Sequence, residues 1–296
     1  MSETERTLAA AATIGNKPVN QDAFAVARNG DAGLVAILVA DGVGSHFGAE
    51  VASAMVVAKL REALETAVSP CEIDIPSLFF DARTHLERHV KQHAGDLPAD
   101  LDWHNAFGTT LLCGVERNDH IILGYVGNGG IFHLRGNFNC FPPSQLLPWT
   151  AVNYLNPHSF SQDGKNILYD VLSVNPEHEM TPTVLNLRKS RDRFGDIVMI
   201  CSDGLYSYDQ VPIGKDDQDH IWISGEQSVA LFFQYLNRFF TGDEYTDRTL
   251  QAALEEYLAE IRARGLVADD CTLAVMVTGA ALRFQRSLRG VPSGEI

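Results

Sequence analysis

The segment Leu34–Gly44 reads LVAILVADGVG, and it decides the fold class. Its first seven residues are all apolar and predict a buried strand that ends at Asp41 and Gly42. This is the longest apolar run in the chain, far below the roughly 20 residues that a membrane-spanning helix needs. A strand that stops at a carboxylate holds that side chain rigidly at one end of a sheet.

Four further carboxylates occur in similar settings. Asp203 follows an apolar run, Asp269 and Asp270 directly precede another, and Asp22 comes after Asn-Gln. An Asp-Gly pair such as Asp41-Gly42 is also a common turn signal, so any one of these acids alone predicts a turn more readily than a ligand. Several carboxylates brought together without a counter-charge raise one another's pKa, and a divalent cation removes that penalty. All-oxygen ligands suit Mg²⁺ or Mn²⁺.

The order of predicted elements favours an α+β fold with mostly antiparallel strands. Helical periodicity occurs in two early and two late segments, and the strands cluster between and around them. The predicted helices are 49–67, 76–94, 226–240 and 249–264. The predicted strands are 33–40, 109–115, 120–126, 131–135, 183–187, 196–201 and 272–278.

Composition excludes several classes of protein. The 296 residues carry a formal net charge of −15, which argues against a general grip on nucleic acid or an anionic membrane. The N-terminus is mixed in charge and leads into an alanine run rather than a secretory signal, so we expect a cytoplasmic protein. The five cysteines are scattered without a C-x-x-C pair, which predicts reduced, mostly buried thiols.

Six short motifs in this order resemble the metal-dependent protein phosphatases of type 2C, the PPM family, and in particular their bacterial-type members. The resemblance covers roughly residues 15–278. The motifs are Asn20-Gln21-Asp22, Val39-Ala40-Asp41-Gly42-Val43-Gly44, Gly108-Thr109-Thr110, Gly127-Asn128-Gly129-Gly130, Cys201-Ser202-Asp203-Gly204 and Asp269-Asp270-Cys271-Thr272.

The resemblance implies a four-layer α/β/β/α sandwich, with two central antiparallel sheets flanked by pairs of helices and two Mn²⁺ or Mg²⁺ ions at one end. By position, Asp41 would bridge both ions and the Gly42 carbonyl would ligate one of them. Asp203 and Asp269 would ligate the other ion, and Asp22 would act through bound water. The sequence does not decide between manganese and magnesium.

A phosphatase of this kind needs no protein nucleophile. A water shared by two cations has its pKa lowered enough to supply hydroxide at neutral pH, which attacks a phosphoryl group in line. The cations also neutralise a phosphoserine or phosphothreonine that a protein of this charge would repel. We therefore expect a phosphoprotein substrate and a monomeric enzyme, and a partner serine/threonine kinase is compatible with that role.

Three positions depart from the family pattern. Lys17 stands where the family usually has an arginine that grips the substrate phosphate, and lysine lacks the bidentate fork. Asn128 and Ser207 stand where the family has aspartates associated with a third, loosely held ion. We expect two tightly bound ions and a labile or absent third, although Asp209 lies close enough in sequence to compensate.

Histidines support weaker hypotheses. His46 follows the Gly42 motif and could donate a proton to the leaving oxygen, or serve only as a loop residue. His85, His89 and His93 share one helical face, where a solvated surface is favoured over a transition-metal site because no carboxylate motif accompanies them.

Two other functions compete with catalysis. Gly42-x-Gly44-x-x-x-Gly48 resembles a dinucleotide-binding loop, but Asp41 would then point a carboxylate at the pyrophosphate. The stronger alternative is a phosphatase-like module that binds or senses a phosphoprotein with little turnover.

The domain prediction is a single catalytic domain. It spans residues 1–282, with a proline-rich flap or insertion at about 141–182 and a mobile C-terminal tail at 283–296.

Overall fold

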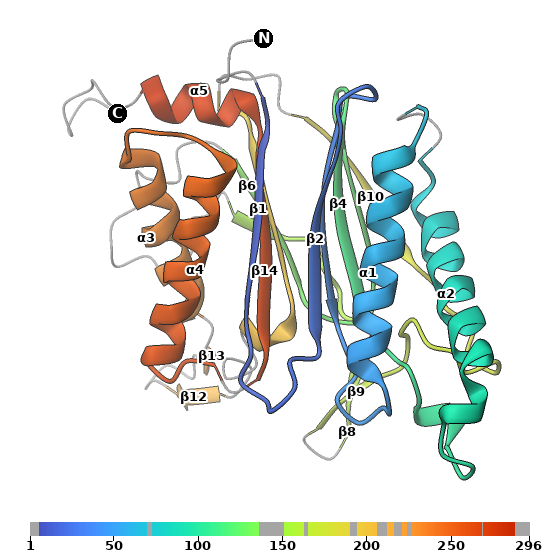
Figure 1. The fold of residues 1–296 in the computed structure, drawn as a ribbon. Helices are drawn as coiled ribbons and strands as arrows, with labels where there is room; N and C mark the ends of the chain where they lie inside the picture. The colour runs from blue at the N-terminus through green and yellow to red at the C-terminus, as the bar shows by residue number, and fades with distance from the viewer. Residues whose placement is uncertain are drawn as a thin grey trace.

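Two five-stranded antiparallel sheets pack face to face, and helices cover the outer face of each (Figure 1). The computed structural model describes residues 6–69, 73–135, 151–162, 165–189, 194–205, 212–215, 221–223, 226–267 and 269–287. This arrangement confirms the predicted α+β sandwich with two central antiparallel sheets.

The first sheet has the strand order β1-β14-β11-β6-β7, with every pair antiparallel. Helices α3, α4 and α5 lie on its outer side (Figure 1). The strands are β1 (Leu8–Ile14), β14 (Cys271–Val277), β11 (Asp196–Cys201), β6 (Gly130–Arg135) and β7 (Ala151–Asn153). The helices are α3 (Glu226–Thr241), α4 (Asp247–Ala263) and α5 (Gly279–Ser287).

The second sheet has the order β10-β5-β4-β3-β2 and is also antiparallel throughout. Helices α1 and α2 cover it (Figure 1). The strands are β10 (Thr183–Arg188), β5 (His120–Val126), β4 (Leu111–Arg117), β3 (Leu34–Asp41) and β2 (Asp22–Asn29). The helices are α1 (Ala49–Thr66) and α2 (Ile75–Gln92).

Short elements complete the described chain. Two hairpins are formed by β8 (Ser159–Gln162) with β9 (Lys165–Leu168) and by β12 (Pro212–Lys215) with β13 (Ile221–Ile223). Single 3₁₀ turns occur at Ala94–Asp96, Trp103–Asn105 and Asp203–Leu205.

The central strands are buried on both faces, which explains their unbroken apolar runs. In β14, Val275 faces the helices while its neighbours Ala274 and Met276 face the other sheet. Successive side chains of a strand point to opposite faces, so both sets must be apolar here. Leu112 of β4 lies fully buried in the layer between the two sheets.

In the two large sheets, β1, β2 and β7 have no counterpart among the predicted strands, and neither do the strands of the two short hairpins. β1 and β2 are rich in alanine, which has low strand propensity, so the alanine run near the N-terminus does not predict a strand. Small side chains fit here because β1 is buried between α4 and the opposite sheet. The four predicted helices all form, each within two residues of its predicted bounds.

The topology excludes the dinucleotide-loop alternative. A dinucleotide fingerprint needs two parallel strands joined by a crossover helix. Here β3 lies between β2 and β4, and it is antiparallel to both. The helix α1 that follows Gly48 therefore does not belong to a βαβ unit.

The predicted tail is wrong at its start, because residues 283–287 belong to helix α5. Leu282 is buried in the core between the first sheet and its helices, and the buried ring of Phe284 meets Phe194 edge-on with centroids 4.7 Å apart. Residues 288–296 lie outside the described part of the chain, as do residues 141–150 and 163–164 of the predicted flap.

None of the described helices is long and apolar enough to cross a membrane. Cys113, Cys201 and Cys271 are free and buried, as predicted, while Cys71 and Cys140 lie outside the described residues.

Several chain segments meet at one end of the sandwich. The hydroxyl groups of Thr13 and Thr272 lie 2.6 Å apart, and the Ser202 amide donates to the Thr272 carbonyl at 2.9 Å. The first residue of β2 pairs with the last residue of β3 in the other sheet. This end of the molecule therefore brings the predicted acidic residues together.

The layer between the sheets is expected to supply much of the stability. Leu112→Ala should lower the free energy of unfolding by about 2–5 kcal/mol, because it removes a fully buried side chain and leaves a cavity. Urea unfolding followed by circular dichroism measures this. Val184→Ala on the outer strand β10, where the side chain is 39% exposed, should change it by about 0.5 kcal/mol or less. Equal losses for both variants would contradict the assigned core.

Candidate metal centre

Three carboxylates from both sheets form what we call the carboxylate cluster: Asp22, Asp41 and Asp203. Asp22 opens β2 and Asp41 closes β3, and the two are direct partners in the antiparallel register. Asp203 begins the 3₁₀ turn that follows β11. The Asp41 carboxyl lies within hydrogen-bonding range of both other carboxyls. The fold therefore gathers side chains that are up to 181 positions apart.

The cluster is electrostatically unfavourable without a counter-charge. Burial, reinforced by the charges of Asp22 and Asp203, raises the pKa of Asp41 well above its ordinary value. Burial also raises the pKa of Asp22 to about 6, although hydroxyl and carboxyl hydrogen bonds oppose the shift. The pKa of Asp203 is raised mainly by burial as well. Between pH 4 and 7 this site takes up protons or requires cations.

The donor set of the cluster fits a hard divalent cation. Asp22 accepts a hydrogen bond from the Ser202 hydroxyl on Oδ2 at 2.8 Å, while its Oδ1 is buried with no partner. An unpartnered buried carboxylate oxygen is costly unless a cation or a proton satisfies it. Within the described residues, no group of three histidine, cysteine or acidic side chains already has metal-binding geometry. The match between the carboxylate cluster and a divalent cation therefore rests on the chemistry of the oxygen donors.

Lys17 and Asp269 form an ion pair next to the cluster, with Nζ and Oδ1 2.5 Å apart. Burial lowers the pKa of Lys17, but the carboxylates of Asp269, Asp41 and Asp270 more than offset this, and the net shift is upward. Asp269 also adds to the negative charge around Asp203. The predicted phosphate-binding residue and a predicted ligand thus neutralise each other in this structure.

Asp270 serves a structural purpose that the sequence did not reveal. It is buried, and Oδ1 accepts the backbone N–H groups of Asn16 and Lys17 at 2.7 and 3.0 Å. Its Oδ2 accepts the N–H of Gln21 at 2.9 Å. Three such bonds fix the loop that carries Lys17. The only signal in the sequence was the pair of acids before an apolar strand.

Asn128 lies against the cluster. Its Nδ2 donates to Oδ2 of Asp203 at 2.6 Å. An aspartate at this position would instead place a fourth negative charge beside Asp203. Ser207 and Asp209, the other two positions considered for a third ion, lie outside the described residues.

His46 lies in a partly buried loop after the Gly42 motif. Burial lowers the pKa of His46, while the charge of Asp102 opposes the shift, so the ring is largely neutral at pH 7. Its Nδ1 is buried without a partner. A Cβ added at Gly108 would lie 2.1 Å from that nitrogen, so the ring can pack here only against glycine.

Gly42 is also restricted to glycine. A Cβ there would come within 2.7 Å of the Ala49 carbonyl, at the start of α1. The Gly42 amide donates to the Gln21 carbonyl at 3.0 Å, which ties the loop after β3 to the loop before β2. This contact holds the Gly42 backbone beside the cluster.

Of the three histidines near the end of α2, His89 and His93 lie in contact with each other. The rings of His89 and His93 lie with centroids 4.2 Å apart, and Nδ1 of His93 lies 2.9 Å from the His89 carbonyl. His85 and His89 are half-buried and His93 is exposed. The favoured reading, a partly solvated helix face, agrees with these contacts.

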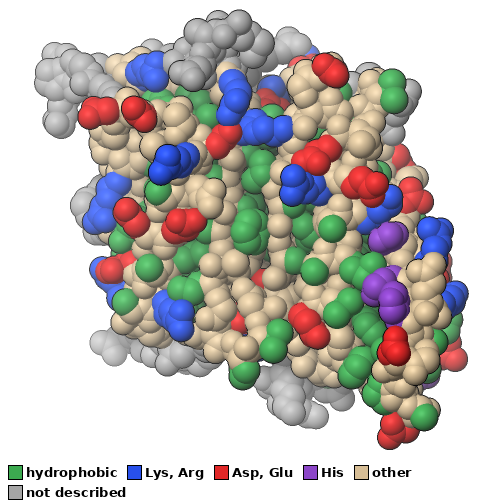
Figure 2. All heavy atoms as spheres, in the orientation of Figure 1, with side chains coloured by type: hydrophobic (Ala, Val, Ile, Leu, Met, Phe, Trp, Pro, Cys, Tyr) green, Lys and Arg blue, Asp and Glu red, His purple; other side chains and the backbone are tan. Residues whose placement is uncertain are grey.

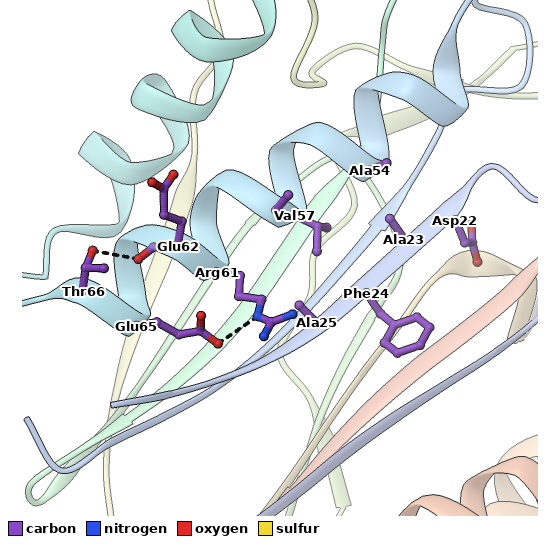
Figure 3. A pocket seen from close by; sticks show the side chains of 11 residues that line it. Asp22, Ala23, Phe24, Ala25, Ala54, Val57, Arg61, Glu62, Glu65 and Thr66 are labelled. Carbon is purple, nitrogen blue, oxygen red and sulfur yellow. Dashed lines mark hydrogen bonds and ion pairs between the residues drawn. The ribbon is translucent and has the colours of Figure 1, made fainter. Parts of the chain in front are cut away.

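A groove of about 550 Å³ runs from Asp22 along the side of β2 (Figure 3). Small side chains of β2 and α1, including Ala25 and Ala54, form much of its lining. At its far end Arg61 donates to Glu65 at 2.8 Å, so these two charges are paired. Figure 2 shows the side of the molecule on which both sheets are seen edge-on, with charged side chains scattered over the visible surface.

Comparisons with known proteins concern the family and the fold. A sequence profile described as Protein phosphatase 2C matches residues 11–259. The fold is similar to that of a Streptococcus agalactiae serine/threonine phosphatase (S. agalactiae; TM-score 0.59, 18% identity, 92% of this chain and 99% of that one). It is also similar to the serine/threonine phosphatase Stp1 from Staphylococcus aureus (TM-score 0.58, 16% identity, 91% and 94%).

A third solved structure is PppA of Pseudomonas aeruginosa, described as a key regulatory component of T6SS (TM-score 0.55, 20% identity, 92% of this chain and 98% of that one). At these identities the likeness concerns the fold. No curated protein matches the chain by sequence.

The carboxylate cluster should make the metal-free protein less stable at neutral pH. Because the folded pKa values are raised, stability is lost as the pH rises from about 4 through the folded values, about 6 for Asp22. Asp41→Asn removes one of the repelling charges. In EDTA at pH 7.5 it should raise Tm by about 2–4 °C, and the gain should vanish near pH 4.

Thermal unfolding followed by circular dichroism at the two pH values measures this effect. Asp81→Asn on α2, where the side chain is exposed, is the matched control and should leave Tm unchanged at both. A lower Tm for Asp41→Asn in EDTA at pH 7.5 would show that the carboxylates are not in electrostatic conflict.

Proposed function

The chain belongs to the protein phosphatase 2C family, and we propose that it hydrolyses phosphoserine and phosphothreonine on proteins with the help of two divalent cations held by the carboxylate cluster. Family membership makes it a protein serine/threonine phosphatase in general terms. The observation that carries the finer proposal is the close approach of the half-buried Asp41 carboxyl to both Asp22 and Asp203, beside an unpartnered Asp22 oxygen.

Five groups of this chain would hold the cations. Asp41, whose carboxyl lies within hydrogen-bonding range of the other two carboxyls of the cluster, would bind both ions. The Gly42 carbonyl would bind one of the ions, and Asp203 and Asp269 would bind the other. Asp22 would act through a bound water. When bound, two Mn²⁺ or Mg²⁺ ions supply an activated water as the nucleophile and neutralise the phosphate charge.

Lys17 would bind the substrate phosphate. Its ammonium group now neutralises Asp269. With a cation bound at Asp269, the Lys17 ammonium would be able to bind phosphate oxygens instead. Because an ammonium group is a point charge without a bidentate fork, we expect weaker phosphate capture than an arginine would give.

His46 is the candidate proton donor to the leaving oxygen. Its lowered pKa leaves few protonated rings at pH 7, so this role would make turnover fall as the pH rises above the pKa of His46. Its confinement against Gly108 keeps the ring in one place beside the loop that carries Gly42.

The groove beside Asp22 supports a protein substrate rather than a small one. It begins at the cluster and continues between β2 and α1, where its lining of small side chains leaves space for a chain that continues from the phosphorylated residue (Figure 3). A partner kinase, a monomeric state and a cytoplasmic location stay predictions. The catalytic domain that we propose includes α5.

One observation favours the alternative of a binding or sensing module. Without any metal ion, the Asn128 amide donates to Asp203, and the Lys17 ammonium forms an ion pair with Asp269. A site neutralised in this way could bind phosphate and turn over slowly. Activity measurements separate the two functions.

Substitution of the cluster should abolish turnover. With Mn²⁺ and a chromogenic phosphate ester, Asp41→Asn and Asp203→Asn should each lower kcat by at least about 100-fold, because each removes a ligand. Asp81→Asn should leave the rate unchanged. A wild-type rate no higher than the metal-only blank favours the sensing module, and wild-type rates in both cluster variants would refute the metal centre.

The third ion can be tested by calorimetry. Wild-type protein should bind two Mn²⁺ ions tightly, and Asn128→Asp should add a third, weaker binding step because it replaces an amide with a charge beside Asp203. Three comparable sites in the wild-type protein would contradict this account of Asn128.

A further inference from the structure

The loop Gly127–Gly130 joins β5 of one sheet to β6 of the other and packs closely against its neighbours beside the carboxylate cluster. Gly127 and Gly129 have φ values of 96° and 120°, which side chains rarely adopt. A Cβ at Gly129 would lie 2.6 Å from the Cys201 carbonyl, and one at Gly127 would lie 2.7 Å from the Thr110 side chain. The loop can therefore move little toward its neighbours.

His158 binds this loop through both backbone groups of Gly127. The His158 amide donates to the Gly127 carbonyl at 2.9 Å, and the Gly127 amide donates to Nδ1 of His158 at 3.2 Å. Because Nδ1 accepts, the ring proton lies on Nε2, which is 3.0 Å from the Thr183 hydroxyl. The ring is buried and stacks near Tyr125, with centroids 5.0 Å apart.

The segment that carries His158 is itself fixed. The Tyr169 amide donates to the His158 carbonyl at 2.9 Å. Buried Asp170 accepts the Thr181 amide at 2.9 Å and lies 3.0 Å from Nε2 of His178. Oδ2 of Asp170, which accepts the Thr181 amide, is 3.7 Å from Nδ1 of His158.

Helix α2 anchors the same segment. The guanidinium group of Arg83 donates to the carbonyls of His178 and Asn175, each at 2.9 Å. A continuous set of contacts thus leads from α2 to His158 and Gly127, and from there through Asn128 to Asp203.

We infer that His158 is a positioning residue for Asp203: it holds Gly127 so that the Asn128 amide orients the carboxylate. This inference rests on the proposed function. His158 contacts no reacting atom, and its effect passes through Asn128. Groups that orient a metal ligand commonly contribute 10–100-fold to metal affinity or activity.

The first test compares three variants at His158 and Thr183. His158→Ala should lower both Mn²⁺ affinity and kcat by about 10–100-fold and leave KM within about 3-fold. His158→Asn keeps an acceptor oxygen near the position of Nδ1 and should restore most of the loss. Thr183→Val removes only the contact at the other ring nitrogen and should stay close to wild type.

A second pair keeps the test informative if His158→Ala does not fold. His158→Gln can reach Thr183 but leaves the Gly127 amide without its acceptor, so it should be impaired while His158→Asn is not. Equal behaviour of the two variants would overturn the inference.

A double-mutant cycle tests whether His158 acts through Asn128. For each variant, the affinity for Mn²⁺ is measured by calorimetry, and kcat is measured as well. If His158 acts through Asn128, then Asn128→Ala with His158→Ala should bind Mn²⁺ about as weakly as the worse single variant. Additive losses, or wild-type affinity in folded His158→Ala, would overturn the inference alone. Wild-type protein that neither binds Mn²⁺ nor hydrolyses the ester would refute the proposed function, and the inference with it.

Discussion

Repulsion between half-buried carboxylates is the constraint on which the rest of this structure depends. Asp41 lies between Asp22 and Asp203, and burial raises the pKa of all three. A folded protein tolerates such a site only if protons, cations or hydrogen bonds offset the repulsion. Only part of that compensation comes from the chain, because the Ser202 hydroxyl and the Asn128 amide reach two of the carboxylates and leave one oxygen of Asp22 without a partner.

The fold brings these charges together through its two sheets. Each sheet is buried on both faces, so its strands are apolar until they end, and the acids come where the strands stop. The loops around the cluster are then fixed by buried polar contacts. Asp270 holds the loop of Lys17, and His158 holds the loop of Asn128. These contacts position charged groups that would otherwise move apart.

Much of this arrangement could be predicted from the sequence, because strand ends and acidic residues are local signals. The apolar runs and the four helical periodicities predicted an α+β fold with mostly antiparallel strands, and the resemblance to type 2C phosphatases implied the layers and the acidic site. The strand β1 lacked such a signal because alanine has low strand propensity. The helix α5 lacked one because it is short and buries apolar side chains only at residues 281, 282 and 284. The contact of His158 with Gly127 joins positions 31 apart, and no spacing rule predicts it. Asp270 was read with Asp269 as one acidic pair, and only the structure separates their surroundings.

The central claim is that the carboxylate cluster holds two divalent cations. Anomalous diffraction from crystals of the protein soaked in Mn²⁺ tests it directly. The account predicts two strong peaks about 3.5–4 Å apart, both in contact with Asp41 and the second also with Asp203 and Asp269. Peaks elsewhere, or none at the cluster under saturating Mn²⁺, would contradict it.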